Sequence, residues 1–135
     1  MQKVLIFLSL MVLLANCQEK PLHQITVKRG NFFYTDGIAS TQAHNTVSFL
    51  AYKGYFDKGE TIQLEKSEAS LHLKMVSKNP NDTTADLSLK LLGKALTEEV
   101  FSSQKLLVEL CDEQMQVKRT LQTDNLKIKS LPKLE

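Results

Sequence analysis

Glycine is scarce in this sequence, and its scarcity excludes several kinds of catalytic site. The 135 residues include only five glycines, and no serine stands in the Gly-x-Ser-x-Gly turn that exposes the nucleophile of many hydrolases. No glycine-rich loop of the kind that cradles phosphate groups is present either. The sequence therefore predicts a protein that is not an enzyme and that uses no cofactor.

The three histidines, His23, His44 and His72, give no sign of a metal centre. None stands at metal-ligand spacing from another histidine or from Cys111. His72 alternates with apolar neighbours, so its side chain is expected on the side of a strand that faces away from the core. We therefore expect no metal site, and we interpret His72 as a surface residue.

Closely spaced carboxylates are also few, and each pair has a structural interpretation. Asp82 and Asp86 stand where a helix begins, which favours helix capping over acid–base catalysis. Asp112 and Glu113 stand where a strand ends, which favours a turn. No catalytic residue is predicted from either pair.

The chain has no strong excess of either charge. It carries 17 basic and 15 acidic residues, a formal net charge of +2. Its basic residues near the C-terminus are spread out and interrupted by Asp124, whereas nucleic-acid-binding domains concentrate them on one face. We expect no nucleic-acid partner. A content of 42% hydrophobic and 24% charged residues is typical of a single globular domain.

The longest apolar run stands at the N-terminus. Lys3 is followed by apolar residues 4–14, interrupted only by Ser9, and then by Ala15-Asn16-Cys17. This order is typical of a secretory signal peptide, which has a basic first region, an apolar run of about a dozen residues and small residues at its cleavage site. The run is shorter than the roughly 20 residues that a membrane-spanning helix needs. Residues 1–17 are therefore predicted to be an export signal.

The end of this signal, Leu14-Ala15-Asn16-Cys17, resembles the lipobox of bacterial lipoproteins. The resemblance implies that Cys17 becomes the lipidated N-terminus, which would anchor the protein by acyl chains such as palmitate in the outer membrane or periplasm. Alternatively, cleavage after Cys17 would use Ala15 and Cys17 as its small residues and release a soluble secreted protein that begins at Gln18.

Cys17 and Cys111 are the only cysteines, so either kind of processing leaves Cys111 without a disulfide partner. The mature domain is then expected to fold by its hydrophobic core alone. Cys111 ends the apolar segment 106–110, and a free cysteine in such a place behaves as a small buried hydrophobe. We predict that Cys111 is buried.

Residues 24–122 predict one α+β domain, preceded by a tether at 18–23 and followed by a tail or edge strand at 123–135. The first half contains a hairpin, a helix and a second strand pair. A turn signal at 29–31 joins the expected strands 25–28 and 32–35. A helix is expected from Ser40 or Thr41, with a hydroxyl side chain as its N-cap and Gly54 as its left-handed C-cap.

Alternating apolar residues predict strands at 61–65 and 71–75, with Ile62, Leu64, Leu71, Leu73 and Met75 facing the core. Apolar residues three or four apart then predict a helix between 85 and 100. The segment 106–111 is too apolar for an edge strand, and residues 112–114 are expected to turn the chain into 115–121.

This order is β-α-β-β-α-β, the ferredoxin-like arrangement, with extra strands at both ends and two helices on one face of the sheet. Right-handed crossovers would place the first and third core strands side by side and the last beside the second. The opposite face is expected to show Gln63, His72 and Lys74, with one aromatic residue from 32–34.

The stretch from Phe33 to Leu121 resembles small uncharacterised α+β domains of exported bacterial proteins. Its layout is also similar to peptidoglycan-binding SPOR repeats, because Gly54-Tyr55-Phe56 matches their helix-ending glycine–aromatic step before a hairpin. The SPOR resemblance implies a glycan-binding module, with Tyr34, Tyr52 and Tyr55 as aromatic contacts.

We therefore predict a membrane-anchored lipoprotein of the cell envelope that acts as a non-enzymatic interaction or structural module. Its partner is an envelope protein or a glycan. The alternative is a SPOR-like module that binds peptidoglycan. An enzyme would need Cys111 or a histidine in a pocket with a perturbed environment.

Overall fold

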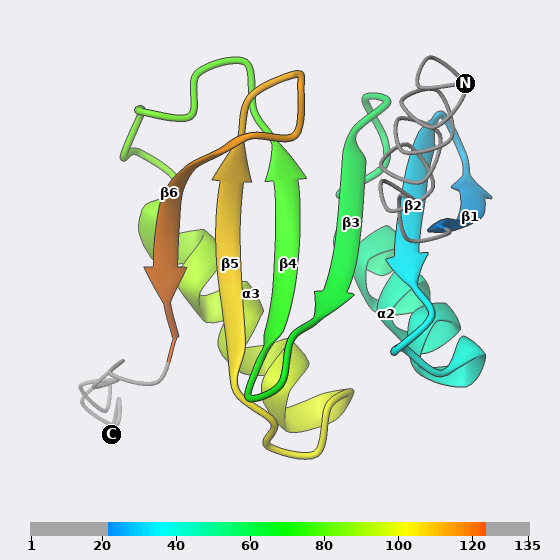
Figure 1. Ribbon diagram of the computed structural model, residues 1–135. Helices are drawn as coiled ribbons and strands as arrows, with labels where there is room; N and C mark the ends of the chain where they lie inside the picture. The colour runs from blue at the N-terminus through cyan, green and yellow to red at the C-terminus, as the bar shows by residue number, and fades with distance from the viewer. Residues whose placement is uncertain (1–21, 124–135) are drawn as a thin grey trace, which may run out of the picture.

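Six strands and two helices make up residues 22–123, the part of the chain that the computed structural model describes (Figure 1). Their order along the chain confirms an α+β fold, broadly ferredoxin-like, with an extra strand at each end. The strands are β1 (Leu22–Val27), β2 (Gly30–Thr35), β3 (Thr61–Lys66), β4 (Leu71–Val76), β5 (Leu106–Cys111) and β6 (Val117–Gln122). The helices are α2 (Ser40–Tyr52) and α3 (Asp86–Glu99).

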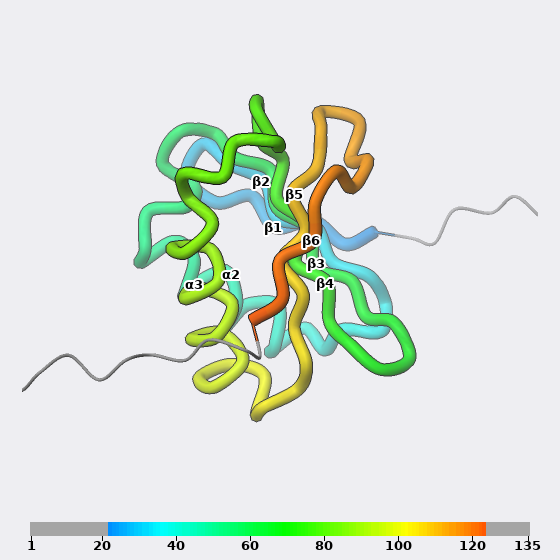
Figure 2. Tube along the Cα trace, turned by 90° about the vertical axis from the view of Figure 1, so that its left-hand side faces the viewer, coloured from blue at the N-terminus to red at the C-terminus, as the bar shows by residue number. Residues whose placement is uncertain are grey.

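Both helices lie on the same face of the sheet, as Figure 2 shows from its side. Side chains alternate between the two faces along each strand, so every second residue turns toward the helices. In β4, for example, Leu71, Leu73 and Met75 are buried in the core, whereas His72 and Lys74 are only partly buried. The predicted core of the β3–β4 hairpin is confirmed, and Ile62 and Leu64 complete it.

The strands lie in the sheet in the same order as in the sequence, from β1 to β6. The expectation that the first and third core strands are neighbours is therefore wrong: β2 pairs with β3, and β5 pairs with β4, both in parallel. Because β2 and β4 run in opposite directions while both helices cover one face, the two crossovers have opposite hands (Figure 1). The one through α2 is left-handed, and the expectation had assumed two right-handed crossovers.

The helices begin without the side-chain caps that the sequence suggests. Ala39 precedes α2 and Ala85 precedes α3, and neither helix has a side-chain hydrogen bond at its N-cap. The carboxylate of Asp82 accepts a hydrogen bond of 2.9 Å from the backbone N–H of Thr84, so it stabilises the turn before α3 instead of the helix itself. The stability of both helices therefore comes mainly from packing on the sheet.

The C-terminal end of α2 matches its prediction. Gly54 has a φ of +84°, and its N–H bonds the carbonyl of Ala51 while the N–H of Tyr55 bonds that of Leu50, both at 3.0 Å. These two bonds are those of a Schellman motif, which favours glycine because glycine adopts positive φ without a steric penalty. The motif turns the chain so that Phe56 enters the core, where it is fully buried.

Arg119 on β6 ties the loop before α3 to the edge of the sheet. Its guanidinium donates two hydrogen bonds of 2.7 and 2.8 Å to the carboxylate of Asp86, and others to the carbonyls of Pro80 and Asp82. The hydrogen bonds from Arg119 lower the pKa of the Asp86 carboxyl. Asp86 is thus held by a residue 33 positions away, a partner that no local pattern reveals.

The first strand begins at Leu22, so His23 lies within β1 and not in the tether. Its ring stacks on that of Tyr34 at 4.9 Å and contacts the carboxylate of Asp36 at 2.5 Å. Neither α2 nor α3, the helices of the described residues, is long and apolar enough to cross a membrane. The predicted export signal, Cys17 and the tail after Thr123 lie outside the described residues.

Candidate functional site

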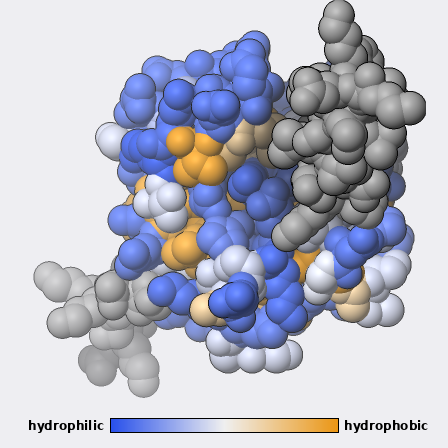
Figure 3. All heavy atoms as spheres, in the orientation of Figure 1, coloured by the Kyte–Doolittle hydropathy of each residue, from blue (hydrophilic) through white to orange (hydrophobic). Residues whose placement is uncertain are grey.

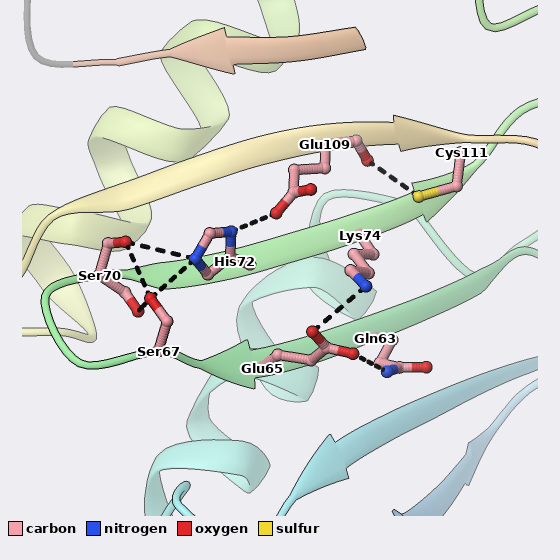
Figure 4. Close-up of polar contacts among 8 residues, drawn as sticks. All are labelled: Gln63, Glu65, Ser67, Ser70, His72, Lys74, Glu109 and Cys111. Atoms are coloured by element: carbon pink, nitrogen blue, oxygen red, sulfur yellow. Dashed lines mark hydrogen bonds and ion pairs between the residues drawn. The ribbon is translucent and has the colours of Figure 1, made fainter. Parts of the chain in front are cut away.

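The sheet face that the helices leave uncovered carries a cluster of polar side chains. The part of this face that is visible in Figure 3 is largely hydrophilic, with small hydrophobic patches. The prediction that Gln63, His72 and Lys74 lie on this face is confirmed by their register in the sheet. The cluster spans β3, β4, β5 and the turn between β3 and β4, and we call it the polar cluster: Gln63, Glu65, Ser67, Ser70, His72, Lys74 and Glu109 (Figure 4).

At the centre of the polar cluster, His72 on β4 contacts Glu109 on β5 through its Nδ1 atom. Glu109 exposes only 9% of its side chain and His72 exposes 24%. Burying a carboxylate without a partner is costly. The contact with the His72 imidazole therefore stabilises Glu109 in its buried position. The two residues are 37 positions apart and meet because β4 and β5 are parallel neighbours.

The other ring nitrogen of His72 faces two serines. Its Nε2 atom lies 3.0 Å from the hydroxyl of Ser67 and 3.3 Å from that of Ser70 (Figure 4). An ionised Glu109 can only accept a hydrogen bond, so it places the proton of a neutral imidazole on Nδ1. The lone pair of Nε2 is then available to accept a proton from a serine hydroxyl.

A second group of contacts in the polar cluster pairs two opposite charges. The ammonium of Lys74 lies 3.2 Å from the carboxylate of Glu65, which also accepts a hydrogen bond from the amide of Gln63. Lys74 exposes 19% of its side chain and Glu65 exposes 32%, so both charges are partly shielded from water. The paired charges leave this surface polar without a strong field of either sign.

Cys111 is fully buried, as predicted. Burial raises the pKa of its thiol, so the reactive thiolate is disfavoured. Its sulfur lies 3.8 Å from the backbone carbonyl of Glu109 (Figure 4). Cys111 is therefore a buried residue whose environment disfavours the nucleophilic thiolate.

The other residues that the sequence offered as functional do not join the polar cluster. His44 contacts the backbone carbonyl of Ser40 on α2 at 2.8 Å. Of the three tyrosines, Tyr34 is buried in the core and Tyr52 is largely exposed on α2, so they do not form one binding surface. Among residues 22–123, no group of three or more histidine, cysteine or acidic side chains is arranged to hold a metal ion.

The sequence predicted three of the seven residues of the polar cluster, and it did not predict the contacts between them. Alternation placed His72 and Lys74 on the correct face, but it gave His72 no partner. Glu109 was overlooked because its segment is so apolar that it resembles a fully buried strand. A single acidic residue in such a segment was the available signal, because a charge in a buried strand needs a partner on a neighbouring strand.

Comparison with known proteins identifies a family for this fold. A family model described as the AF_1994_N family N-terminal domain matches residues 24–123. No curated protein and no solved structure matches the chain. The match spans β1 to β6, apart from the first two residues of β1, and its description names no ligand or activity.

Proposed function

The chain belongs to the AF_1994_N family, whose N-terminal domain matches residues 24–123, and we propose that it is an envelope lipoprotein that binds a glycan on this domain. The glycan lies on the polar cluster and on Phe33. The observation that carries this proposal is the combination, on one uncovered sheet face, of paired polar groups with a partly exposed aromatic ring.

Phe33 supplies the apolar part of this surface. Phe32 and Tyr34 are buried on the helix side of β2, whereas Phe33 turns to the other face and is only partly buried. It pairs with Gln63 across the parallel strands β2 and β3, so the ring stands beside the polar cluster. The apolar side of a sugar ring fits such an aromatic surface, while its hydroxyls reach the polar groups alongside.

The low net charge of the polar cluster also favours a glycan. A strongly charged ligand would require an excess of the opposite charge, and Lys74 is already paired with Glu65. Sugar hydroxyls both donate and accept hydrogen bonds, so they fit groups such as the Gln63 amide and the Glu65 carboxylate without adding charge.

The short distance between Cys17 and β1 supports the lipoprotein part of the proposal. The first strand begins at Leu22, five residues after Cys17. Five residues reach at most about 18 Å when fully extended. A lipid on Cys17 would therefore hold the domain within reach of the membrane surface, where envelope glycans are abundant.

Replacing the predicted lipid acceptor tests the anchor. We expect the Cys17→Ala variant to leave the membrane fraction, because acyl chains hold a protein by about 0.8 kcal/mol for each buried methylene group. Cell fractionation and intact-mass measurement of the mature protein give the readout. The Cys111→Ala variant removes the other cysteine and should stay in the membrane. A Cys17→Ala protein that remains in the membrane would disprove the anchor, as would an unmodified wild-type chain that begins at Gln18.

Replacing Phe33 tests the binding surface. We expect Phe33→Ala to weaken co-sedimentation with purified peptidoglycan about tenfold, because an aromatic contact contributes about 0.5–1.5 kcal/mol beyond the area that it buries. Tyr52→Ala is the matched control, since Tyr52 is an aromatic residue on α2 with 87% of its surface exposed. Equal binding by both variants, or no binding of the wild-type protein at any salt concentration, would overturn the proposal.

A further inference from the structure

Ser67, His72 and Glu109 form a continuous chain from hydroxyl to imidazole to carboxylate, and we propose that Ser67 is the nucleophile of a site that hydrolyses short-chain esters. The three residues come from the β3–β4 turn, from β4 and from β5 (Figure 4). Their sequence order gives no hint of this, because Glu109 follows the other two by more than 35 positions. Ester hydrolysis at Ser67 goes beyond glycan binding and does not depend on it.

Glu109 prepares His72 to act as a general base. The buried carboxylate holds the proton on Nδ1, so the free lone pair of Nε2 faces the serine hydroxyls. This is the tautomer that a serine nucleophile requires, since Nε2 must take the hydroxyl proton as the oxygen attacks. Glu109 is thus a positioning residue, and His72 is the base.

Ser67 is better placed than Ser70 to be the nucleophile. Its hydroxyl is the nearer one to Nε2, at 3.0 against 3.3 Å, and Ser67 is exposed whereas Ser70 is partly buried. The N–H of Ser67 donates a hydrogen bond of 2.9 Å to the carbonyl of Ser70, which closes the turn between β3 and β4. The Ser67 hydroxyl also lies 3.2 Å from this carbonyl and 3.3 Å from the Ser70 hydroxyl, and its contact with Nε2 of His72, at 3.0 Å, is the shortest of the three. This closed turn holds the Ser67 hydroxyl beside the imidazole on the next strand, and a nucleophile needs such fixed positioning.

A small pocket adjoins Ser67 and limits the substrate. Its volume is about 120 Å³, and Ser67 and Ser70 lie on its wall with Lys66 and Lys105. Ordinary ligand pockets hold about 300–1,000 Å³, so this one is of a size to hold a short acyl group such as acetyl. The two lysines outnumber Glu68, the one carboxylate on the same wall, so the pocket has a net positive charge where negative charge develops on the carbonyl oxygen during the reaction.

The reaction proceeds in two steps, the acylation of Ser67 and the hydrolysis of the acyl-serine. In the first, the Ser67 oxygen attacks the ester carbonyl carbon, its proton passes to Nε2 of His72, and the ester C–O bond breaks as that proton moves to the leaving alcohol. In the second, water attacks the acyl-serine and gives a proton to Nε2. The bond between the acyl carbon and Ser67 then breaks, the proton returns to the serine oxygen, and the carboxylic acid leaves.

The chain contains its own control for this arrangement. On α2, the hydroxyl of Ser40 lies 3.5 Å from the Nδ1 atom of His44. That nitrogen already contacts the backbone carbonyl of Ser40 at 2.8 Å, and no carboxylate of residues 22–123 forms a hydrogen bond or ion pair with the ring. A serine and a histidine are therefore adjacent there without the third group, so Ser40 is expected to be unreactive.

Labelling with a fluorophosphonate, followed by peptide mass spectrometry, tests the proposal. We expect the phosphonyl group on Ser67 and none on Ser40. The Ser67→Ala variant should lose the label, whereas Ser70→Ala should keep it. His72→Gln and Glu109→Gln should each slow the labelling and the hydrolysis of p-nitrophenyl acetate by about 100-fold or more, the usual contribution of general base catalysis.

Three results would overturn the proposal: labelling of Ser67 no faster than that of Ser40, wild-type labelling rates in both glutamine variants, or a label on Ser70 instead of Ser67. Circular dichroism of each variant shows whether it is folded. Because Glu109→Gln keeps the size of the side chain, it provides the test if His72→Gln does not fold. Fluorophosphonate labelling of Phe33→Ala separates the two proposals, since Phe33 is not one of the contacts among Ser67, His72 and Glu109, and this variant should lose glycan binding but keep the label on Ser67.

Discussion

Replacing Phe56 with alanine is expected to lower the free energy of unfolding by about 3–5 kcal/mol. Phe56 is fully buried and follows the Schellman motif at the end of α2. Its ring packs closely against the start of β2, where a Cβ atom added at Gly30 would lie only 2.7 Å from the Phe56 Cδ1 atom. Truncation would leave a cavity at the point where the left-handed crossover returns to the sheet, and the surrounding backbone is already fixed by strand pairing.

Chemical denaturation followed by circular dichroism measures this effect. Tyr52→Ala is the matched control, because it removes a ring of similar size that is 87% exposed at the end of α2, four residues before Phe56. We expect this control to change the free energy of unfolding by less than about 0.5 kcal/mol. If the two variants lose similar stability, Phe56 is not a core residue of the crossover.

Gly93→Ala is expected to destabilise the protein by about 1–3 kcal/mol, the usual cost of overpacking. The opposite sign would follow from helix propensity alone, since alanine inside a helix is favoured over glycine by about 1 kcal/mol. Packing decides the outcome here, because a Cβ atom at Gly93 would lie 2.5 Å from Cγ2 of Thr123 and 3.0 Å from Cγ2 of Val108. Gly93 thus lets α3 approach the sheet closely.

A compensating substitution makes this prediction specific. Thr123→Ser removes the clashing methyl group and keeps the hydroxyl that donates a hydrogen bond of 3.1 Å to the carbonyl of Leu106. In a double-mutant cycle, Gly93→Ala should cost less in the Thr123→Ser background than in the wild-type protein. Ser88→Ala, at an exposed position of α3, should be nearly neutral. A Gly93→Ala protein more stable than wild type would contradict the close approach.

Much of the fold followed from local patterns. Alternation in β3 and β4 predicted both strands and their core residues, and Gly54 marked the end of α2 because positive φ strongly favours glycine. The N-caps were not predicted correctly, since the sequence suggested a hydroxyl residue for α2 and the aspartates near 82–86 for α3, whereas Ala39 and Ala85 occupy these positions. A local signal is weak when packing against the sheet supplies most of the stability of a helix.

The candidate site was harder to predict. The sequence contains no catalytic motif, so it led us to expect a non-enzymatic protein with His72 as an isolated surface residue. The contacts from His72 to Glu109 and Ser67 are what motivate the ester-hydrolysis proposal. These contacts depend on strand order, because parallel pairing of β4 with β5 brings Glu109 beside His72.

The sequence by itself determined which segments form strands and helices and which strand residues turn toward the core. The positions of these segments and the direction of their side chains depend on the spacing of apolar residues over a few positions of the sequence. Only the tertiary structure decided the strand order, the hand of the α2 crossover, and the partners of His72 and Asp86. These depend on contacts between residues more than 30 positions apart, as between His72 and Glu109 or between Asp86 and Arg119. No local pattern encodes such contacts, because they form only when the whole sheet is assembled.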